Sequence, residues 1–128
     1  MRYELQAGVI VVEEEDGVLN VGFGDDSGVR KHHVLLQRGL VPDEQDLTMG
    51  MDRPHLELDG QGWGDYVSPD SVTLSGGALA IDLPAEDAAN VGGHAEIRIT
   101  WAPGVIDHSD LASALRRVFE GCVPLNLR

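Results

Sequence analysis

The stretch VLLQRGLVPDEQDLTMGM, residues 34–51, changes character three times, and the expected fold can be built outward from it. It begins with the apolar run VLL, whose length and flanks predict a short buried strand. The chain then turns polar and carries the carboxylates of Asp43, Glu44 and Asp46. A carboxylate-rich connection between apolar anchors is typical of a surface that meets a partner, although a solvated loop explains the same spacing.

The residues on the N-terminal side of this stretch predict a hairpin. Residues 2–13 are apolar on both parities, which indicates either a strand covered on both faces or a bulge near residues 7–8 that switches the face. The Asp-Gly pair at residues 16–17 predicts a tight turn, because both residues tolerate a positive φ. Residues 18–23 predict the returning strand. Its apolar face consists of Leu19, Val21 and Phe23.

The C-terminal side predicts further strands from the same alternation of apolar and polar residues. They fall at residues 55–58, 71–75, 78–83 and 96–101. A Gly-rich connection over residues 59–70 carries Trp63, and we expect this large aromatic side chain to be buried.

Two helices are expected near the C-terminal end. The first is short and spans residues 84–91, and the second spans residues 109–120 with Asp107 or Ser109 as its cap. The apolar stripe of the second helix needs a sheet to cover it and consists of Leu111, Leu115, Val118 and Phe119. We therefore predict one α+β domain over residues 1–128, with a mostly antiparallel, strongly curved β-sheet and a C-terminal helix packed on it.

The chain is strongly acidic. It has 22 Asp and Glu residues against 9 Lys and Arg residues, which gives a formal net charge of -13. This charge repels the phosphate backbone, so direct nucleic-acid binding is not expected, and it favours a basic partner. Solubility alone is the simpler explanation of the same acidity.

The single cysteine, Cys122, cannot form an internal disulfide, and the N-terminal residues show no signal-peptide pattern. We therefore expect a cytoplasmic protein. No apolar run approaches the roughly 20 residues that span a bilayer, so no membrane insertion is expected.

No catalytic motif stands out in the sequence, and we expect neither an enzyme nor a cofactor. The adjacent His32 and His33 invite a metal site, but neighbours in a strand point to opposite faces and would not chelate one ion together. The alternative function is that of a small enzyme or ligand-binding domain that uses surface carboxylates and histidines.

Five short motifs resemble the immunity protein 10 family. They are GVLNVGFGDD (residues 17–26), LLQR (35–38), DEQD (43–46), GMD (50–52) and RVFEG (117–121). The resemblance implies a small, non-catalytic bacterial protein of a polymorphic toxin system, which neutralises a cognate protein toxin by tight stoichiometric binding. Because many toxins that attack nucleic acid have basic active sites, the acidity makes a basic nuclease one candidate partner. A toxin of another kind stays open.

Three acidic stretches are candidates for the contact with that partner. Residues 13–16 and the pair Asp25 and Asp26 are explained by turn chemistry. Asp43, Glu44 and Asp46 lie on a longer connection that neighbouring apolar residues can fix to the body of the protein. We therefore predict that these three carboxylates meet the partner, with Asp25 and Asp26 as the second choice.

Overall fold

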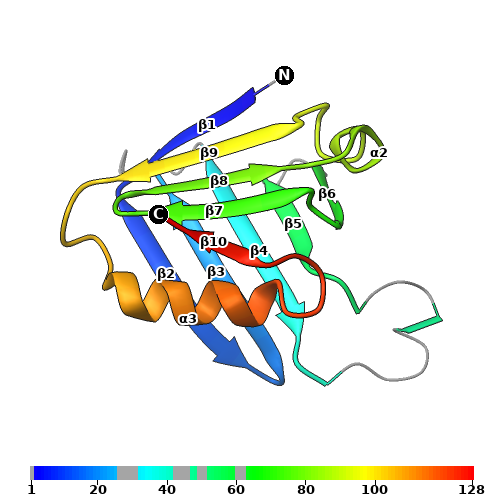
Figure 1. Cartoon of the computed structure of the whole chain (residues 1–128), viewed down its shortest axis with the longest axis horizontal. Coiled ribbons are helices and arrows are strands. Elements are labelled where there is room, and N and C mark those ends of the chain that lie inside the picture. Colours follow the sequence, from blue (N-terminus) through cyan, green and yellow to red (C-terminus); the bar gives the residue numbers. More distant parts are fainter. Residues whose placement is uncertain (1, 26–31, 42–46, 49–51, 60–62) are drawn as a thin grey trace.

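The computed structural model describes residues 2–25, 32–41, 47–48, 52–59 and 63–128 of the chain. In this part of the chain ten strands form two five-stranded sheets, and helix α3 packs on one of them (Figure 1). The predicted α+β class, with a helix near the C-terminal end packed on a sheet, is therefore confirmed. None of the described helices is long and apolar enough to cross a lipid bilayer.

The first sheet has the strand order β1-β9-β8-β7-β10 and is mixed. The pairs β1–β9 and β7–β10 run parallel, whereas the other neighbours run antiparallel. Its strands are β1 (Arg2–Ala7), β7 (Ser71–Ser75), β8 (Ala78–Asp82), β9 (Glu96–Trp101) and β10 (Leu125–Leu127). The short helix α2 (Ala85–Ala88) lies between β8 and β9, inside the range that the sequence predicts.

The second sheet has the order β2-β3-β4-β5-β6 and is antiparallel throughout. Each strand therefore pairs with the next one along the chain. The strands are β2 (Val9–Glu15), β3 (Val18–Gly24), β4 (His33–Gly39), β5 (His55–Leu58) and β6 (Trp63–Tyr66). The run VLL that opens the central stretch lies in β4, where Val34 and Leu36 are fully buried, as predicted.

The chain passes from the first sheet to the second at Gly8. Tyr3, Leu5 and Ala7 are buried in β1, and the parity of burial then switches to Ile10 in β2. The Gly8 N–H donates to the carbonyl oxygen of Gly24 at 2.9 Å, which ties this crossing to the second sheet. The change of face that the sequence predicts near residues 7–8 is thus a change of sheet.

The turn between β2 and β3 has the predicted backbone. Asp16 has φ 52° and Gly17 has φ 77°, the left-handed conformations that a two-residue hairpin of this type requires. Residues 13–15 belong to β2 itself and are exposed, so the interpretation of residues 13–16 as turn chemistry alone is wrong.

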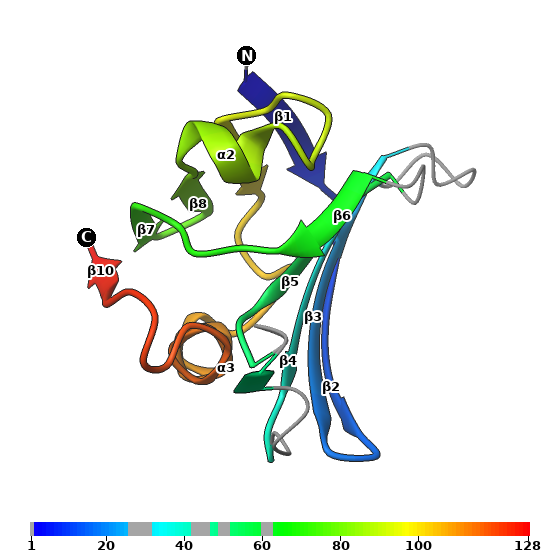
Figure 2. The same ribbon diagram turned by 90° about the vertical axis from the view of Figure 1, so that its right-hand side faces the viewer.

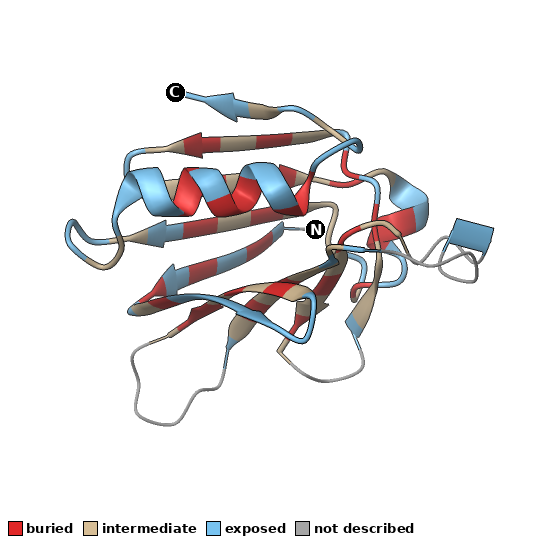
Figure 3. Ribbon diagram, turned by 90° about the horizontal axis from the view of Figure 1, so that it is seen from below, coloured by how far each residue is buried: buried red, intermediate tan, exposed pale blue. Residues whose placement is uncertain are grey.

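The buried side chains of both sheets and of α3 form one core (Figure 3). Alternation along the strands directs every second residue into it, so that Leu19, Val21 and Phe23 of β3 are all buried, as predicted. Ile97 and Ile99 supply the matching inward positions of β9.

Helix α3 (His108–Val118) covers the inner side of β3 and β4. The side chain of Asp107 accepts a hydrogen bond from the Asp110 N–H at 3.0 Å, which confirms the first of the two predicted caps. At the other end Arg38 of β4 donates to the carbonyl oxygens of Val118 at 2.6 Å and Glu120 at 3.0 Å. A cation is favoured there by the helix dipole, so Arg38 fixes the end of α3 to the sheet.

Several features differ from the prediction. The sequence predicts a single β-sheet, whereas the described residues form ten strands in two sheets. The predicted burial of Trp63 is wrong, because it lies on β6 with 40% of its surface exposed and its ring edge-on to His94 at 5.8 Å. The strong curvature of the sheet and the single domain over residues 1–128 stay predictions.

Candidate functional site

One face of the second sheet is left uncovered. In Figure 2 α3 lies on one side of β2–β6, and no described element lies on the opposite side, which we call the outer face. Directly paired residues on neighbouring strands share a face. The register of the five strands therefore defines which side chains the outer face presents.

The outer face consists of four rows that run across the strands. The first row contains Val9, Gly24 and His33; the second contains Val11, Gly22, Leu35, Glu57 and Gly64; the third contains Glu13, Asn20, Gln37, His55 and Tyr66; and the fourth, next to the β2–β3 turn, contains Glu15, Val18 and Gly39. The second row is apolar at its centre and the third is polar throughout. An apolar strip is thus bordered by polar side chains.

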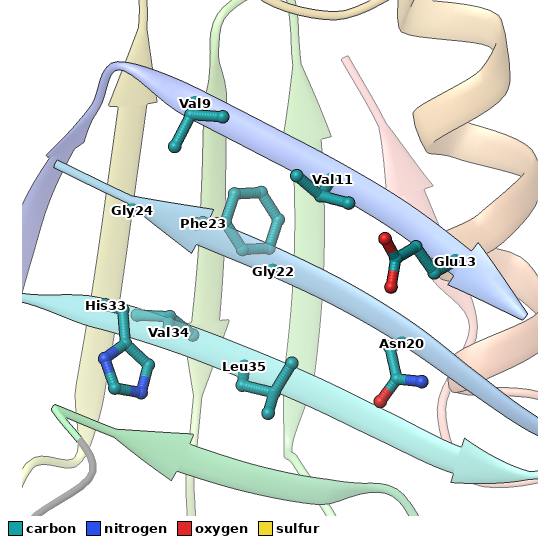
Figure 4. A pocket seen from close by; sticks show the side chains of 10 residues that line it. All are labelled: Val9, Val11, Glu13, Asn20, Gly22, Phe23, Gly24, His33, Val34 and Leu35. Carbon is teal, nitrogen blue, oxygen red and sulfur yellow. The ribbon is translucent and has the colours of Figure 1, made fainter. Parts of the chain in front are cut away.

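A hollow of about 410 Å³ lies on this face over β2, β3 and β4 (Figure 4). Its floor is the backbone at Gly22 and Gly24, and its walls are Val9 and Val11 from β2 and Leu35 from β4. Gly22 creates the depression because it places no side chain between its row neighbours Val11 and Leu35. Val11 lies on the edge strand β2 and is 40% exposed, so the wall that it forms is open to solvent.

The polar row beside the hollow is partly fixed by its own contacts. The Gln37 Nε2 atom donates to Asn20 Oδ1 at 2.8 Å. The rings of His55 and Tyr66 meet edge to face at 5.1 Å. These contacts hold the side chains of β3, β4, β5 and β6 in defined positions, so that the border of the hollow is preorganised.

The carboxylates of the outer face have no neighbouring Lys or Arg side chains among the described outward positions of the sheet. Glu13 and Glu57 form no ion pair within the described part of the chain. The face therefore has a negative potential that the structure itself leaves uncompensated.

The outward side of the first sheet has the opposite character. Arg98 contacts Asp82 at 3.0 Å and Glu96 at 3.5 Å, and Arg2 contacts Glu96 at 2.9 Å and Glu4 at 3.3 Å. Burial raises the pKa of Asp82, but the hydrogen bonds from Ser71 and Arg98 outweigh it, and the pKa of Asp82 lies below its ordinary value. The carboxylates of this sheet thus have partners within the protein.

A second polar site joins the two sheets and centres on Asp59, directly after β5. The Tyr3 hydroxyl of β1 and the His33 N–H of β4 both donate to Asp59 Oδ1, the latter at 3.0 Å. His32 Nδ1 lies 3.3 Å from Asp59 Oδ2. We call these four residues the Asp59 cluster. Asp59 itself has φ 59°, a left-handed conformation that Asp tolerates better than most residues.

The cluster shifts the pKa of two of its members. Burial of the hydroxyl, followed by its hydrogen bond to Asp59, raises the pKa of Tyr3 far above its ordinary value. Burial also raises the pKa of Asp59, but the hydrogen bonds from Tyr3, the His33 N–H and His32 outweigh it, so the pKa of Asp59 lies below its ordinary value. Asp59 is therefore held as a carboxylate and Tyr3 as a neutral phenol.

The Asp59 cluster links the first sheet to the second through hydrogen bonds, and we call this link the clamp. Both carboxylate oxygens of Asp59 are engaged by the protein, and the side chain is only 11% exposed. His32 contacts this carboxylate, whereas His33 lies on the outer face beside the hollow, so the two histidines point apart as expected. Within the described ranges no group of three or more metal-ligating side chains is found.

The predicted contact residues fall mostly outside the described residues. Asp43, Glu44, Asp46 and Asp26 all do, so their role stays a prediction. Asp25 is described: its N–H donates to the His32 carbonyl oxygen at 3.2 Å, at the end of β3 opposite the β2–β3 turn. The structure therefore places Asp25 near the Asp59 cluster rather than near the connection between β4 and β5.

The outer face was not predicted as a site. Alternation in residues 18–23 does indicate that Asn20 and Gly22 share one side of a strand, which is part of the signal. The contribution of Val11, Leu35 and Glu57 depends on the register of three further strands, and single-sequence alternation does not determine register between strands.

The sequence matches the family described as Immunity protein 10 over residues 6–107. This range includes all strands of the outer face and ends before α3, so the RVFEG motif at residues 117–121 lies beyond it. A comparison with curated proteins found no match. Because the family match spans well over half of the chain, the protein belongs to the immunity protein 10 family.

Proposed function

We propose that this protein neutralises a cognate bacterial toxin in the cytoplasm by tight stoichiometric binding, without catalysis. The observation that carries the proposal is the match to the immunity protein 10 family, which suggests a toxin-neutralising function in general. Immunity by binding requires a stable surface rather than a reactive group. The preorganised outer face is a surface of that kind.

The charge of the chain supports a basic toxin as the partner. With a net charge of -13, the protein attracts a cationic surface at long range, and such steering raises association rates by about 10- to 1,000-fold. A nuclease, whose active site must attract phosphate, is one class of toxin with that charge. The proposal holds equally for a basic toxin with another activity.

The acidic segment between β4 and β5 stays part of the proposed contact. Asp43, Glu44 and Asp46 lie between Gly39, which ends β4, and His55, which begins β5. Leu40 is anchored where the segment leaves the sheet, because its N–H donates to the Gly17 carbonyl oxygen at 2.9 Å. The segment therefore leaves the sheet at the end that carries the exposed carboxylates of β2, and we keep these three residues as the first choice and Asp25 and Asp26 as the second.

Co-expression with the toxin encoded beside the gene tests the proposed function. We expect the protein to restore growth, and the two purified proteins to form a complex of fixed stoichiometry by gel filtration and calorimetry. Restored growth that needs only substoichiometric amounts of the protein would contradict binding as the mechanism. A toxin that remains fully active beside an excess of the folded protein would contradict neutralisation itself.

A ligand-binding domain or small enzyme is the second candidate, because the hollow lies beside His33 and Glu13, a histidine and a carboxylate. It predicts that metabolites from a cell extract bind the purified protein and are retained or converted. Retention of a small molecule, together with no effect on the neighbouring toxin, would favour this function over toxin binding.

A further inference from the structure

The two sheets of this protein differ in whether their outward carboxylates form ion pairs with neighbouring cations. This difference indicates a binding face. On the first sheet Arg2 and Arg98 neutralise the neighbouring carboxylates within 2.9–3.5 Å. On the outer face of the second sheet Glu13 and Glu57 have no such partner among the described residues. Carboxylates that a protein leaves uncompensated beside an apolar strip are suited to a cation brought by another molecule.

The apolar strip between those carboxylates is a recess rather than a ridge. Gly22 forms its floor, and Val11 and Leu35 stand on either side of it (Figure 4). Partner side chains that dominate binding insert into recesses of this kind near the centre of an interface, where the surrounding contacts exclude water. The recess therefore suits an apolar side chain that projects from the partner.

We infer that the outer face over β2–β5 is the surface that holds the toxin, and that it takes a cationic protein surface which inserts an apolar side chain over Gly22. Cations of the partner then lie against Glu13 and Glu57, on either side of the inserted side chain. The inference rests on the proposed function and specifies where on the molecule it is carried out.

Charge also favours a cationic protein over the other molecules that could bind an uncovered sheet face. A second copy of the chain would bring the same two glutamates and a further net charge of -13 to the contact. Nucleic acid and anionic lipid would be repelled for the same reason. A basic protein is the macromolecule whose charge is complementary to this face.

Two sets of variants separate the recess from the charges. Gly22→Val fills the recess, and it should fold because Gly22 does not need a positive φ and a Cβ there lies 3.9 Å from Leu35 Cδ1, an ordinary contact. Val11→Lys, at an exposed position, brings a cation against the cationic partner and serves as a second test should the first variant fold poorly. Glu13→Gln with Glu57→Gln removes the two charges and leaves the recess unchanged.

The matched controls lie elsewhere on the molecule. Ala80→Val adds similar bulk to the outward side of β8, in the middle of the first sheet. Glu120→Gln removes an exposed carboxylate just after α3. Circular dichroism and thermal melting of each variant show that it is folded before its binding to the neighbouring toxin is measured by surface plasmon resonance.

We expect Gly22→Val and Val11→Lys to weaken binding by roughly tenfold or more, mostly through faster dissociation. The double glutamine variant should slow association, and its effect should shrink as salt is added. Both controls should bind like the wild type.

Three results would overturn the inference. Wild-type affinity in folded Gly22→Val and Val11→Lys, with the toxin still neutralised, would reject the outer face while leaving the proposed function intact. Self-association of the wild-type chain that Gly22→Val abolishes would assign the face to a second copy. A toxin that the wild-type protein does not bind at all would reject the proposed function and the inference with it.

Discussion

Asp59 shows how a single residue connects the two sheets. Its carboxylate accepts from Tyr3 of β1 and from the His33 N–H of β4, so one side chain spans strands that belong to different sheets. Hydrogen bonds to a buried charged acceptor stabilise a fold more than neutral ones. The clamp should therefore be visible in the stability of the whole protein and in its dependence on pH.

We predict that Asp59→Asn lowers the free energy of unfolding by roughly 1–2 kcal/mol near neutral pH. The pKa of Asp59 is lowered in the folded state, so its contribution is fully present above the unfolded pKa of about 4 and is lost as the pH falls through the lower folded value. The difference between wild type and variant, measured by urea unfolding, should be constant from about pH 7 to pH 5 and shrink below about pH 4.

Asp16→Asn is the matched control for this experiment. Asp16 is the other described residue besides glycine with a positive φ, and it is exposed in the β2–β3 turn. It should show little change at any pH. A difference for Asp59→Asn that does not depend on pH would show that the shape of the side chain, and not its charge, matters at this position.

At the scale of an element, α3 is the part of the fold that the sequence predicts best. Its stripe, its N-terminal cap and the glycine after it are all local signals, and the structure confirms Leu115 and Phe119 as core residues with 0% and 1% exposure. Arg38, which fixes the end of the helix to β4, could not be predicted, because its partners lie about 80 positions further along the chain.

We predict that Phe119→Ala lowers the free energy of unfolding by about 3–5 kcal/mol, because it removes a fully buried aromatic side chain and leaves a cavity under α3. Chemical denaturation measures the change. Arg116→Ala, at an exposed position of the same helix, is the control and should stay within about 0.5 kcal/mol of the wild type. A loss well under 1 kcal/mol for Phe119→Ala would place this end of α3 in a site that collapses easily.

The strands could be predicted individually but not their assembly. Alternation identifies β3, β5, β7, β8 and β9 because each has a clear inward set. It does not show that the chain changes sheets at Gly8, since a crossing and a bulge leave the same parity switch in the sequence. The edge strands β6 and β10 were missed because neither has a buried residue, so that no inward-facing set marks them in the sequence.

On the scale of the whole molecule, the two sheets differ in whether their carboxylates form ion pairs within the protein. The first sheet neutralises its carboxylates internally, whereas the outer face of the second sheet leaves Glu13 and Glu57 without partners in the described part of the chain. Net charge could be read from the composition, but this contrast depends on which strands are neighbours. The sequence therefore predicts a basic partner but does not predict the face that we infer to meet it.

The acidic segment gives the prediction at this scale. We expect Glu44→Gln and Asp46→Asn each to leave the melting temperature unchanged and to slow association with the toxin, with an effect that decreases as the salt concentration rises. Stopped-flow association rates and thermal melts measure the two quantities. Glu86→Gln, an exposed carboxylate on α2, is the control.

A lower melting temperature with unchanged association would show that these carboxylates support the segment itself. In that case Glu13 and Glu57 would carry the electrostatic attraction alone. The acidic segment and the outer face are therefore tested independently, although the segment lies between two strands of the second sheet in the sequence.

The parallel pairing of β1 with β9 also bears on the order in which we expect the chain to acquire its structure. The strands of the second sheet are neighbours in sequence, so their contacts close short loops and can form early. β1 has to wait for a partner 94 positions away. At about 5–20 residues per second, synthesis reaches that partner some seconds after β6 has been made. Because Tyr3 lies on β1, which pairs with β9, we expect the hydrogen bond from Tyr3 to Asp59 to be stabilised only after β9 is available, so that the clamp follows the assembly of the second sheet rather than nucleating it.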